Sequence, residues 1–237
     1  MNDPRNPSAD AEFPDRENIL AKVAGGRLLV LGTVHLSPDF ETVVDSIVRE
    51  EHPDLVLVEL DPQRLAILEA LDRGDIEISQ VSGPDEEVPS LLQKVQTYFA
   101  NQVGVMPGAE MLRAVRTARE LGIPYDFMDL PIEETISNLN NVTETEQAAI
   151  ISELKQLLSG ENLAEVEAAI EDYANLPDLL PAFNREFPEL SQVVLATRED
   201  HMVRVIRQWL RGSDHQKILV VCGLGHKDTL LAALGKD

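Results

Sequence analysis

Short aliphatic runs divide the chain and predict the strands of a central sheet. Residues 27–31, 55–60 and 217–222 are rich in Leu, Ile and Val at successive positions instead of alternate ones. Runs of this kind are typical of strands that are buried on both faces. A shorter run at 125–129 predicts one further strand. The pattern therefore indicates a sheet of at least four strands.

Between these runs the apolar residues recur every three or four positions, which predicts amphipathic helices. The expected helices lie at about 40–51, 61–71, 91–99, 108–121, 132–139, 144–158, 163–173, 190–210 and 226–234. Asp61-Pro62 is a typical helix start, because Asp can cap free backbone N–H groups and Pro suits the first turn. Strand, helix and strand in succession predict a parallel pair joined by a right-handed crossover.

The fold class that follows is α/β: a parallel or mixed central sheet of at least four strands, with helices on both faces and a helical insertion. Residues 1–18 are polar and are expected to form a disordered arm. Residues 19–237 are expected to form a single domain, within which 131–190 is a helical subdomain. The irregular stretch 73–107 is interpreted as an insertion over the open end of the sheet, and its role is left open.

The net charge of the chain limits the classes of binding partner that we expect. The 42 acidic and 20 basic residues give a net charge of −22, which repels phosphate backbones and anionic lipid. We therefore expect no nucleic-acid partner, and we expect a salt-adapted, halophilic source because salt screens self-repulsion. The single cysteine, Cys222, lies in an apolar run and is expected to be a buried hydrophobe. No apolar leader or membrane-length segment is apparent, so the expected location is cytoplasmic.

Four side chains that can bind divalent metals follow the predicted strands. They are His35, Glu59, Asp129 and His226. Because the carboxyl ends of parallel strands meet at one edge of a sheet, we expect these groups to lie together. Two imidazoles and one or two carboxylates suit Mn²⁺, Co²⁺, Zn²⁺ or Fe²⁺. The alternatives are that the histidines are turn residues, that Glu59 pairs with Arg64, and that Asp129 caps the next helix.

Three further residues are candidates for catalytic work. Arg64 lies five residues after Glu59 and could orient it or polarise a substrate oxygen. Arg198 shares the apolar stripe of its helix, so it must find an acidic partner, with Glu59 and Asp129 as candidates. Glu110 opens the helix after Pro107-Gly108, as an additional acid/base residue or as a carboxylate that favours the helix dipole.

These residues lie in short motifs that resemble the TraB/PrgY family. The matching segments occur in family order over about residues 27 to 230, at 32–37, 53–61 with Arg64, 107–111, 129–135, 197–202 and 223–226. The resemblance implies an α/β fold and a metal-dependent hydrolase site like that of the related TIKI proteases and erythromycin-esterase-like proteins. It points to the residues His35, Glu59, Arg64, Glu110, Arg198 and His226. Leu130 departs from the Asp-Arg pair that is common in the family at this strand end.

The sequence therefore predicts a divalent-metal-dependent hydrolase that acts on peptides. His35, Glu59, His226 and Asp129 are the expected metal ligands, and Arg64 and Arg198 would fix Glu59 or stabilise an oxyanion. Two alternatives stay open: a non-catalytic peptide-binding or regulatory protein of the pheromone-shutdown kind, and a protein whose His pair binds haem or iron. The expected partner is a peptide or small-molecule substrate, and a homodimer is left open.

Overall fold

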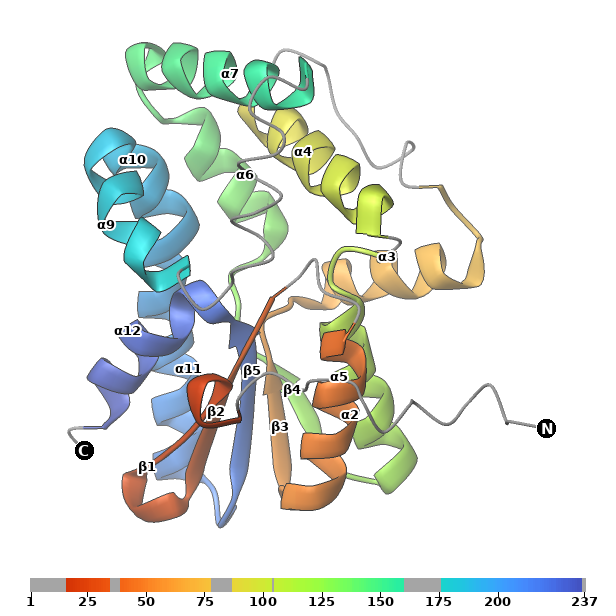
Figure 1. Ribbon diagram of the computed structural model, residues 1–237. Helices are drawn as coiled ribbons and strands as arrows, with labels where there is room; N and C mark the ends of the chain where they lie inside the picture. The colour runs from red at the N-terminus through yellow and green to blue at the C-terminus, as the bar shows by residue number, and fades with distance from the viewer. Residues whose placement is uncertain (1–15, 35–38, 78–86, 104, 160–175, 236–237) are drawn as a thin grey trace.

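The computed structural model describes residues 16–34, 39–77, 87–103, 105–159 and 176–235. Its centre is a five-stranded mixed sheet of order β1-β2-β5-β3-β4 (Figure 1). The first strand pairs antiparallel with its neighbour, and the other pairs are parallel. The strands are β1 (Leu20–Val23), β2 (Leu28–Thr33), β3 (Leu55–Val58), β4 (Tyr125–Phe127) and β5 (Ile218–Gly223). The predicted α/β fold class is confirmed.

The three middle strands consist of residues that are all buried, as their aliphatic sequences predicted. Strand β5 lies between β2 and β3 although it comes last in the chain. Its final residue, Gly223, is paired in register with Thr33, the final residue of β2. The carboxyl ends of β2, β3 and β5 therefore lie side by side at one edge of the sheet.

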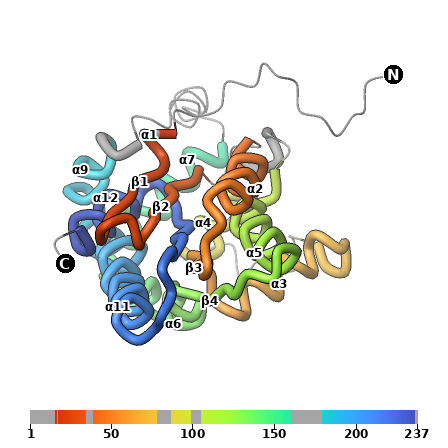
Figure 2. The backbone as a smooth tube through the Cα atoms, turned by 90° about the horizontal axis from the view of Figure 1, so that it is seen from below, coloured from red at the N-terminus to blue at the C-terminus, as the bar shows by residue number. Residues whose placement is uncertain are grey.

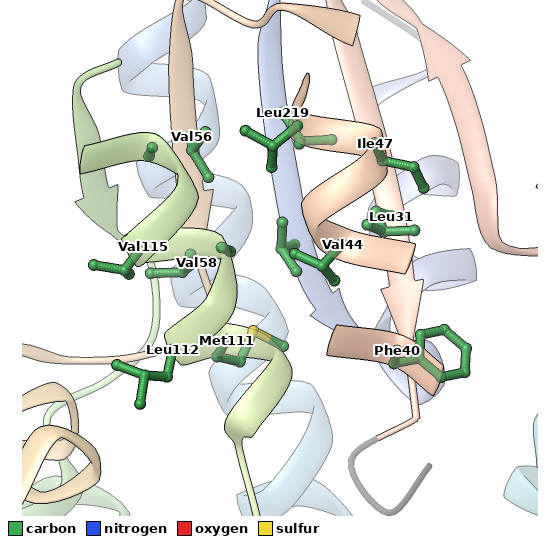
Figure 3. Packing of buried hydrophobic residues seen from close by; sticks show 14 of the residues in the cluster. Leu31, Phe40, Val44, Ile47, Val56, Val58, Met111, Leu112, Val115 and Leu219 are labelled. Carbon is green, nitrogen blue, oxygen red and sulfur yellow. The ribbon is translucent and has the colours of Figure 1, made fainter. Parts of the chain in front are cut away.

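Helices cover both faces of this sheet (Figure 2). On one face α2 and α5 pack against alternate strand residues, such as Leu31, Val58 and Leu219 (Figure 3). On the other face α11 and α12 pack against the intervening residues, such as Val30 and Val220. The bounds are α2 (Asp39–Glu51), α5 (Ala109–Leu121), α11 (Thr197–Gly212) and α12 (Leu224–Leu234).

A separate group of helices lies above the carboxyl ends of the strands (Figure 1). It has its own apolar cluster, to which Val88, Leu139, Ile150 and Leu190 belong. Val88 comes from the stretch 73–107, so that stretch shares one core with the helices of 131–190. The helices of this layer are α4 (Val88–Val103), α6 (Ile132–Asn140), α7 (Glu144–Ser159) and α10 (Pro188–Ser191), with α9 (Leu176–Glu186) beside them.

The remaining elements lie near the N-terminus and at two junctions. Helix α1 (Arg16–Ile19) and β1 were not predicted, and α1 includes the last residues of the expected arm 1–18. The others are η1 (Ala24–Gly26), α3 (Pro62–Arg73) and the π-helical turn η4 (Gln192–Ala196). Asp61 caps α3 as predicted, by accepting from the backbone N–H groups of Gln63 and Arg64.

Two further expectations concern particular segments. The helix expected at 163–173 and the arm residues 1–15 lie outside the described residues. Within the described ranges, none of the helices combines the length and the apolar character that crossing a membrane requires.

Candidate functional site

Glu59 is at the centre of the candidate site, directly after β3. Its backbone N–H continues the sheet by donating to Val221 O at 3.0 Å, and the residue is only 5% exposed. The carboxylate accepts a 2.6 Å hydrogen bond from the backbone N–H of Gly223 and another hydrogen bond from Nη2 of Arg198. Nε2 of His226 lies 3.4 Å from its Oε1. A buried carboxylate is thus compensated from three other elements: Gly223 of β5, His226 of α12 and Arg198 of α11.

Arg198 joins Glu59 to Asp129, the residue that follows β4. Its Nε lies 3.0 Å from Oδ1 of Asp129, its Nη2 lies 2.6 Å from Oδ2, and its Nη1 donates to Val194 O at 3.0 Å. The prediction that Arg198 needs Glu59 or Asp129 as a partner is confirmed, since it binds both. The two carboxylates raise the pKa of Arg198 although burial opposes this shift.

Asp129 is held by a second guanidinium group as well. Nη2 of Arg64 donates to its Oδ2 at 2.5 Å, and the backbone N–H of Leu130 donates to its Oδ1 at 2.8 Å. Burial raises the pKa of Asp129, but the positive charges of Arg198 and Arg64 outweigh burial and lower it overall. Both carboxylate oxygens are therefore engaged by donors of the protein, and in this structure Asp129 holds the two arginines in place.

Arg64 lies in the first turn of α3 and is oriented by its own helix cap. Its Nε donates to Oδ2 of Asp61 at 2.6 Å, and its Nη2 contacts Asp129 and, at 3.3 Å, Leu130 O. The same Asp61 caps α3 with its other oxygen. The sequence offered Arg64 as a partner of Glu59. In the structure the ion pair of Glu59 is with Arg198, and Arg64 forms ion pairs with Asp61 and Asp129.

His226 lies in the first turn of α12 and is 5% exposed. Its Nδ1 is 3.0 Å from Oε1 of Glu199, and its Nε2 faces Glu59. Burial lowers the pKa of the imidazole, but the charge of Glu59 and the hydrogen bond with Glu199 outweigh burial and raise the pKa to about 9. In the absence of a ligand the ring is therefore protonated at neutral pH.

Glu199 is a member of the site that the sequence pattern did not single out. It is 8% exposed and directly follows Arg198 in α11. Periodicity selects residues three or four positions apart, so the neighbour of an inward-facing residue is not selected. The signal available in the sequence was its place inside the segment 197–202, which carries part of the family resemblance.

The two remaining candidates are Glu110 and His35. Glu110 is 2% exposed in the first turn of α5, on the face of the sheet opposite to α11. Its helix thus lies on the side of the sheet that does not carry Arg198. His35 lies outside the described residues. The strand that leads to it ends at Thr33, beside Gly223 and the start of α12.

The donors that suit a metal ion here are Glu59 and His226. Within the part of the chain that the structure describes, no group of three or more His, Cys, Asp and Glu side chains could hold an ion. Glu59 and His226 form a pair of suitable chemistry, a carboxylate beside an imidazole whose other nitrogen has a carboxylate partner. The donor set therefore fits a metal in part.

Comparison with known proteins places the chain in a family. The family model described as TraB/PrgY/gumN matches residues 19–229. An uncharacterized protein of Methanocaldococcus jannaschii is 25% identical over 216 residues, which cover 88% of this chain and 53% of the relative. TraB domain-containing proteins of Bos taurus and Homo sapiens are 25% and 24% identical, over 79% of this chain and 53% and 54% of their own lengths. The chain thus spans about half the length of these curated relatives.

Proposed function

The chain belongs to the TraB/PrgY/gumN family, and from that premise we propose that it is a divalent-metal-dependent hydrolase acting on peptides. The names of its relatives describe a domain and no reaction, so the proposal depends on the chemistry of the site. The proposed metal ligands are Glu59 and His226, with His35 as the third.

The distance between Glu59 and His226 carries this proposal. Nε2 of His226 and Oε1 of Glu59 are 3.4 Å apart. Two donors bound to one tetrahedral ion at about 2.0–2.1 Å are about 3.3 Å from each other, so the pair has the spacing of neighbouring ligands. Imidazole and carboxylate together suit Zn²⁺, Mn²⁺, Co²⁺ or Fe²⁺. In the metal-free protein a proton on His226 balances the charge of Glu59.

The third ligand is proposed from the register of the sheet. Thr33 ends β2 beside Gly223, which is three residues before His226. His35 follows Thr33 by two residues in the sequence, and Thr33 ends β2 at the edge of the sheet where Glu59 and His226 lie. We leave Asp129 out of the proposed ligand set because two arginines, Arg64 and Arg198, and a backbone N–H hold it. Glu59 is held by one arginine and one backbone N–H, and its Oε1 also faces Nε2 of His226.

A bound divalent ion would supply an acidified water molecule as the nucleophile for hydrolysis. The contacts of Arg198 support a holding role for this residue, since its Nε, Nη1 and Nη2 all donate to acceptors of the protein. By holding Glu59 in place, Arg198 would preserve a ligand and not stabilise an oxyanion directly. Glu110 remains the proposed additional acid/base residue, in a helix on the other face of the sheet.

Metal titration tests this proposal. We expect the chelator-treated protein to bind about one equivalent of Mn²⁺, Co²⁺ or Zn²⁺ by calorimetry, and His226→Gln and Glu59→Gln to abolish that binding. His215→Gln is the matched control, because His215 forms an ion pair with Asp54 at another place. Metal binding that is unchanged in both site variants contradicts the proposal.

Peptide turnover is the second measurement. The reloaded protein is incubated with a mixed peptide library, and mass spectrometry detects cleavage that His226→Gln abolishes. Binding of peptides without cleavage at every metal loading would favour the non-catalytic regulatory alternative. A Soret band in protein purified with haem, lost in His226→Gln, would favour the haem alternative.

A further inference from the structure

We propose that Glu199 is a positioning residue of this site, which holds the imidazole of His226 through Nδ1 and so leaves Nε2 to face Glu59. The role for Nε2 rests on the proposed function, because a metal would bind at that nitrogen. The hydrogen bond that positions the ring does not depend on a metal.

The chemistry of the two groups fixes the direction of the hydrogen bond. Oε1 of Glu199 is 3.0 Å from Nδ1 of His226. An ionised carboxylate has no hydrogen to donate, so the hydrogen must be on Nδ1. In the metal-free protein the protonated ring carries a hydrogen on each nitrogen. A metal would take the place of the hydrogen on Nε2, and the hydrogen on Nδ1 would remain with Glu199. A carboxylate partner on the distal nitrogen is the usual way in which a ligating histidine is oriented.

Burial makes Glu199 hard to replace as the partner of His226. The side chains of His226 and Glu199 are only 6% and 10% exposed. Solvent therefore has little access to Nδ1, and loss of the carboxylate would leave a buried N–H group without its acceptor. A buried N–H group without an acceptor is unfavourable, so the ring would turn or shift to find another partner.

Two consecutive residues of helix α11 bind the two members of the Glu59–His226 pair. Arg198 points to Glu59, and Glu199 points to His226. Successive helical residues differ by about 100° in direction, so one helix placed beside both strand ends can reach both groups. The π-helical turn η4 ends directly before Thr197, and its Val194 carbonyl accepts from Arg198. Local π-helical geometry often occurs where a functional side chain must be re-aimed.

NMR of the metal-free protein tests the positioning directly. The chain has five histidines, so ¹⁵N-histidine labelling gives few signals, and the His226 signal is identified by its loss in His226→Gln. We expect a downfield, slowly exchanging Nδ1–H resonance in the wild type and in Asp200→Ala, an exposed acidic residue next to Glu199. The resonance should be lost in Glu199→Ala and move upfield in Glu199→Gln, whose amide is a weaker acceptor. An unchanged resonance in both Glu199 variants overturns the proposal.

Zinc affinity, measured by competition with a chelator, is the second readout. We expect Glu199→Ala to bind Zn²⁺ roughly 10–100-fold more weakly than the wild type, and Asp200→Ala to bind it like the wild type. Equal Zn²⁺ affinity in the wild type and in Glu199→Ala would show that Glu199 does not position His226 for metal binding. If the wild type binds none of Zn²⁺, Mn²⁺ and Co²⁺, the proposed function fails, and the NMR result alone decides the role of Glu199. If Glu199→Ala does not fold, as judged by circular dichroism, Glu199→Gln carries both comparisons.

Discussion

The backbone N–H of Gly223 donates a 2.6 Å hydrogen bond to Oε2 of Glu59. The sequence Gly-x-x-His occurs at 32–35 and again at 223–226. Gly223 opens the second of these motifs, and His226, which closes it, has Nε2 3.4 Å from the other oxygen of the same carboxylate. The motif thus contacts Glu59 at both ends. Strand β5 lies beside β3. A motif near the end of the chain therefore contacts Glu59, which lies in the first quarter of the chain.

Replacing Arg198 should strongly destabilise the protein. Its side chain is 15% exposed and compensates Glu59 and Asp129, which are 4% and 0% exposed at the side chain. Arg198→Met leaves both buried carboxylates with one cation fewer, and we expect a loss of about 3–5 kcal/mol in the free energy of unfolding. Arg198→Lys should lose less, because it keeps the charge without the forked geometry. Urea unfolding measures the effect.

The matched control for Arg198 is Arg204→Met. Arg204 is exposed on the same helix and donates to the carbonyl of Asp200. An exposed substitution of this kind is expected to change the free energy of unfolding by less than about 0.5 kcal/mol. Equal losses of unfolding free energy in the Arg198 and Arg204 variants would show that the buried ion pairs add no more stability than an exposed arginine does.

The charge of His226 should make stability depend on pH. Its pKa is raised to about 9 in the folded protein, against 6.5 for an ordinary histidine side chain. A raised pKa stabilises the fold fully below pH 6.5, and this contribution is lost as the pH rises through about 9. The loss amounts to about 1.4 kcal/mol per pH unit within that window, or about 3 kcal/mol in total.

Unfolding in urea at pH 6, 7.5, 9 and 10, with chelator present, measures this pH dependence. The wild type should lose more stability than His226→Gln between pH 6.5 and 9, so the difference between the two proteins should shrink as the pH rises. A difference that stays constant or grows over this range contradicts a protonated His226 in the folded state.

The two Gly-x-x-His regions should respond differently to an added methyl group. A Cβ at Gly32 would lie 2.8 Å from Cδ1 of Leu224 and 3.2 Å from its Cα, because β2 packs closely on α12. A Cβ at Gly225 would meet nothing within 4 Å. We expect Gly32→Ala to cost about 1–3 kcal/mol, and Gly225→Ala, in a helix, to be neutral or to stabilise by up to about 1 kcal/mol. Thermal unfolding of both variants checks the contrast, which equal melting temperatures would refute.

Asp61 should stabilise the fold through two interactions that can be separated by substitution. Its Oδ1 caps α3, and its Oδ2 accepts from Nε of Arg64. Asp61→Asn keeps a capping oxygen but removes the charge, whereas Asp61→Ala removes both. We expect a loss of about 1–2 kcal/mol in Asp61→Ala and a smaller loss in Asp61→Asn, measured by urea unfolding. Identical losses would mean that the cap is unimportant.

Salt should stabilise the folded chain. The net charge of −22 destabilises the compact state through self-repulsion, and added salt screens that repulsion. We expect the free energy of unfolding to rise between 0.1 M and 2 M KCl, and the salt-adapted character predicted from composition depends on this result. A stability that falls over the same range argues against it.

Much of the fold could be predicted because its signals are local. The aliphatic runs of β2, β3 and β5, and the Asp61-Pro62 start of α3, are each contained in a few successive residues. The antiparallel strand β1 was missed, because its sequence Leu-Ala-Lys-Val is only partly buried and has no strong pattern. The sequence predicted a helix within α4. That this helix shares an apolar core with the helices of 131–190 could not be predicted, because the core depends on contacts between segments far apart in the sequence.

The sequence by itself determined which chemical groups follow the strands, since each lies next to its own apolar run. Only the tertiary structure decided which of these groups meet. The strand order puts β5 between β2 and β3, and this brings His226 to Glu59, while α11 adds Arg198 and Glu199 from outside the sheet. Periodicity along the chain reports which face of an element is buried. Strand order and partner choice depend instead on packing between segments far apart in sequence, and no local pattern encodes them.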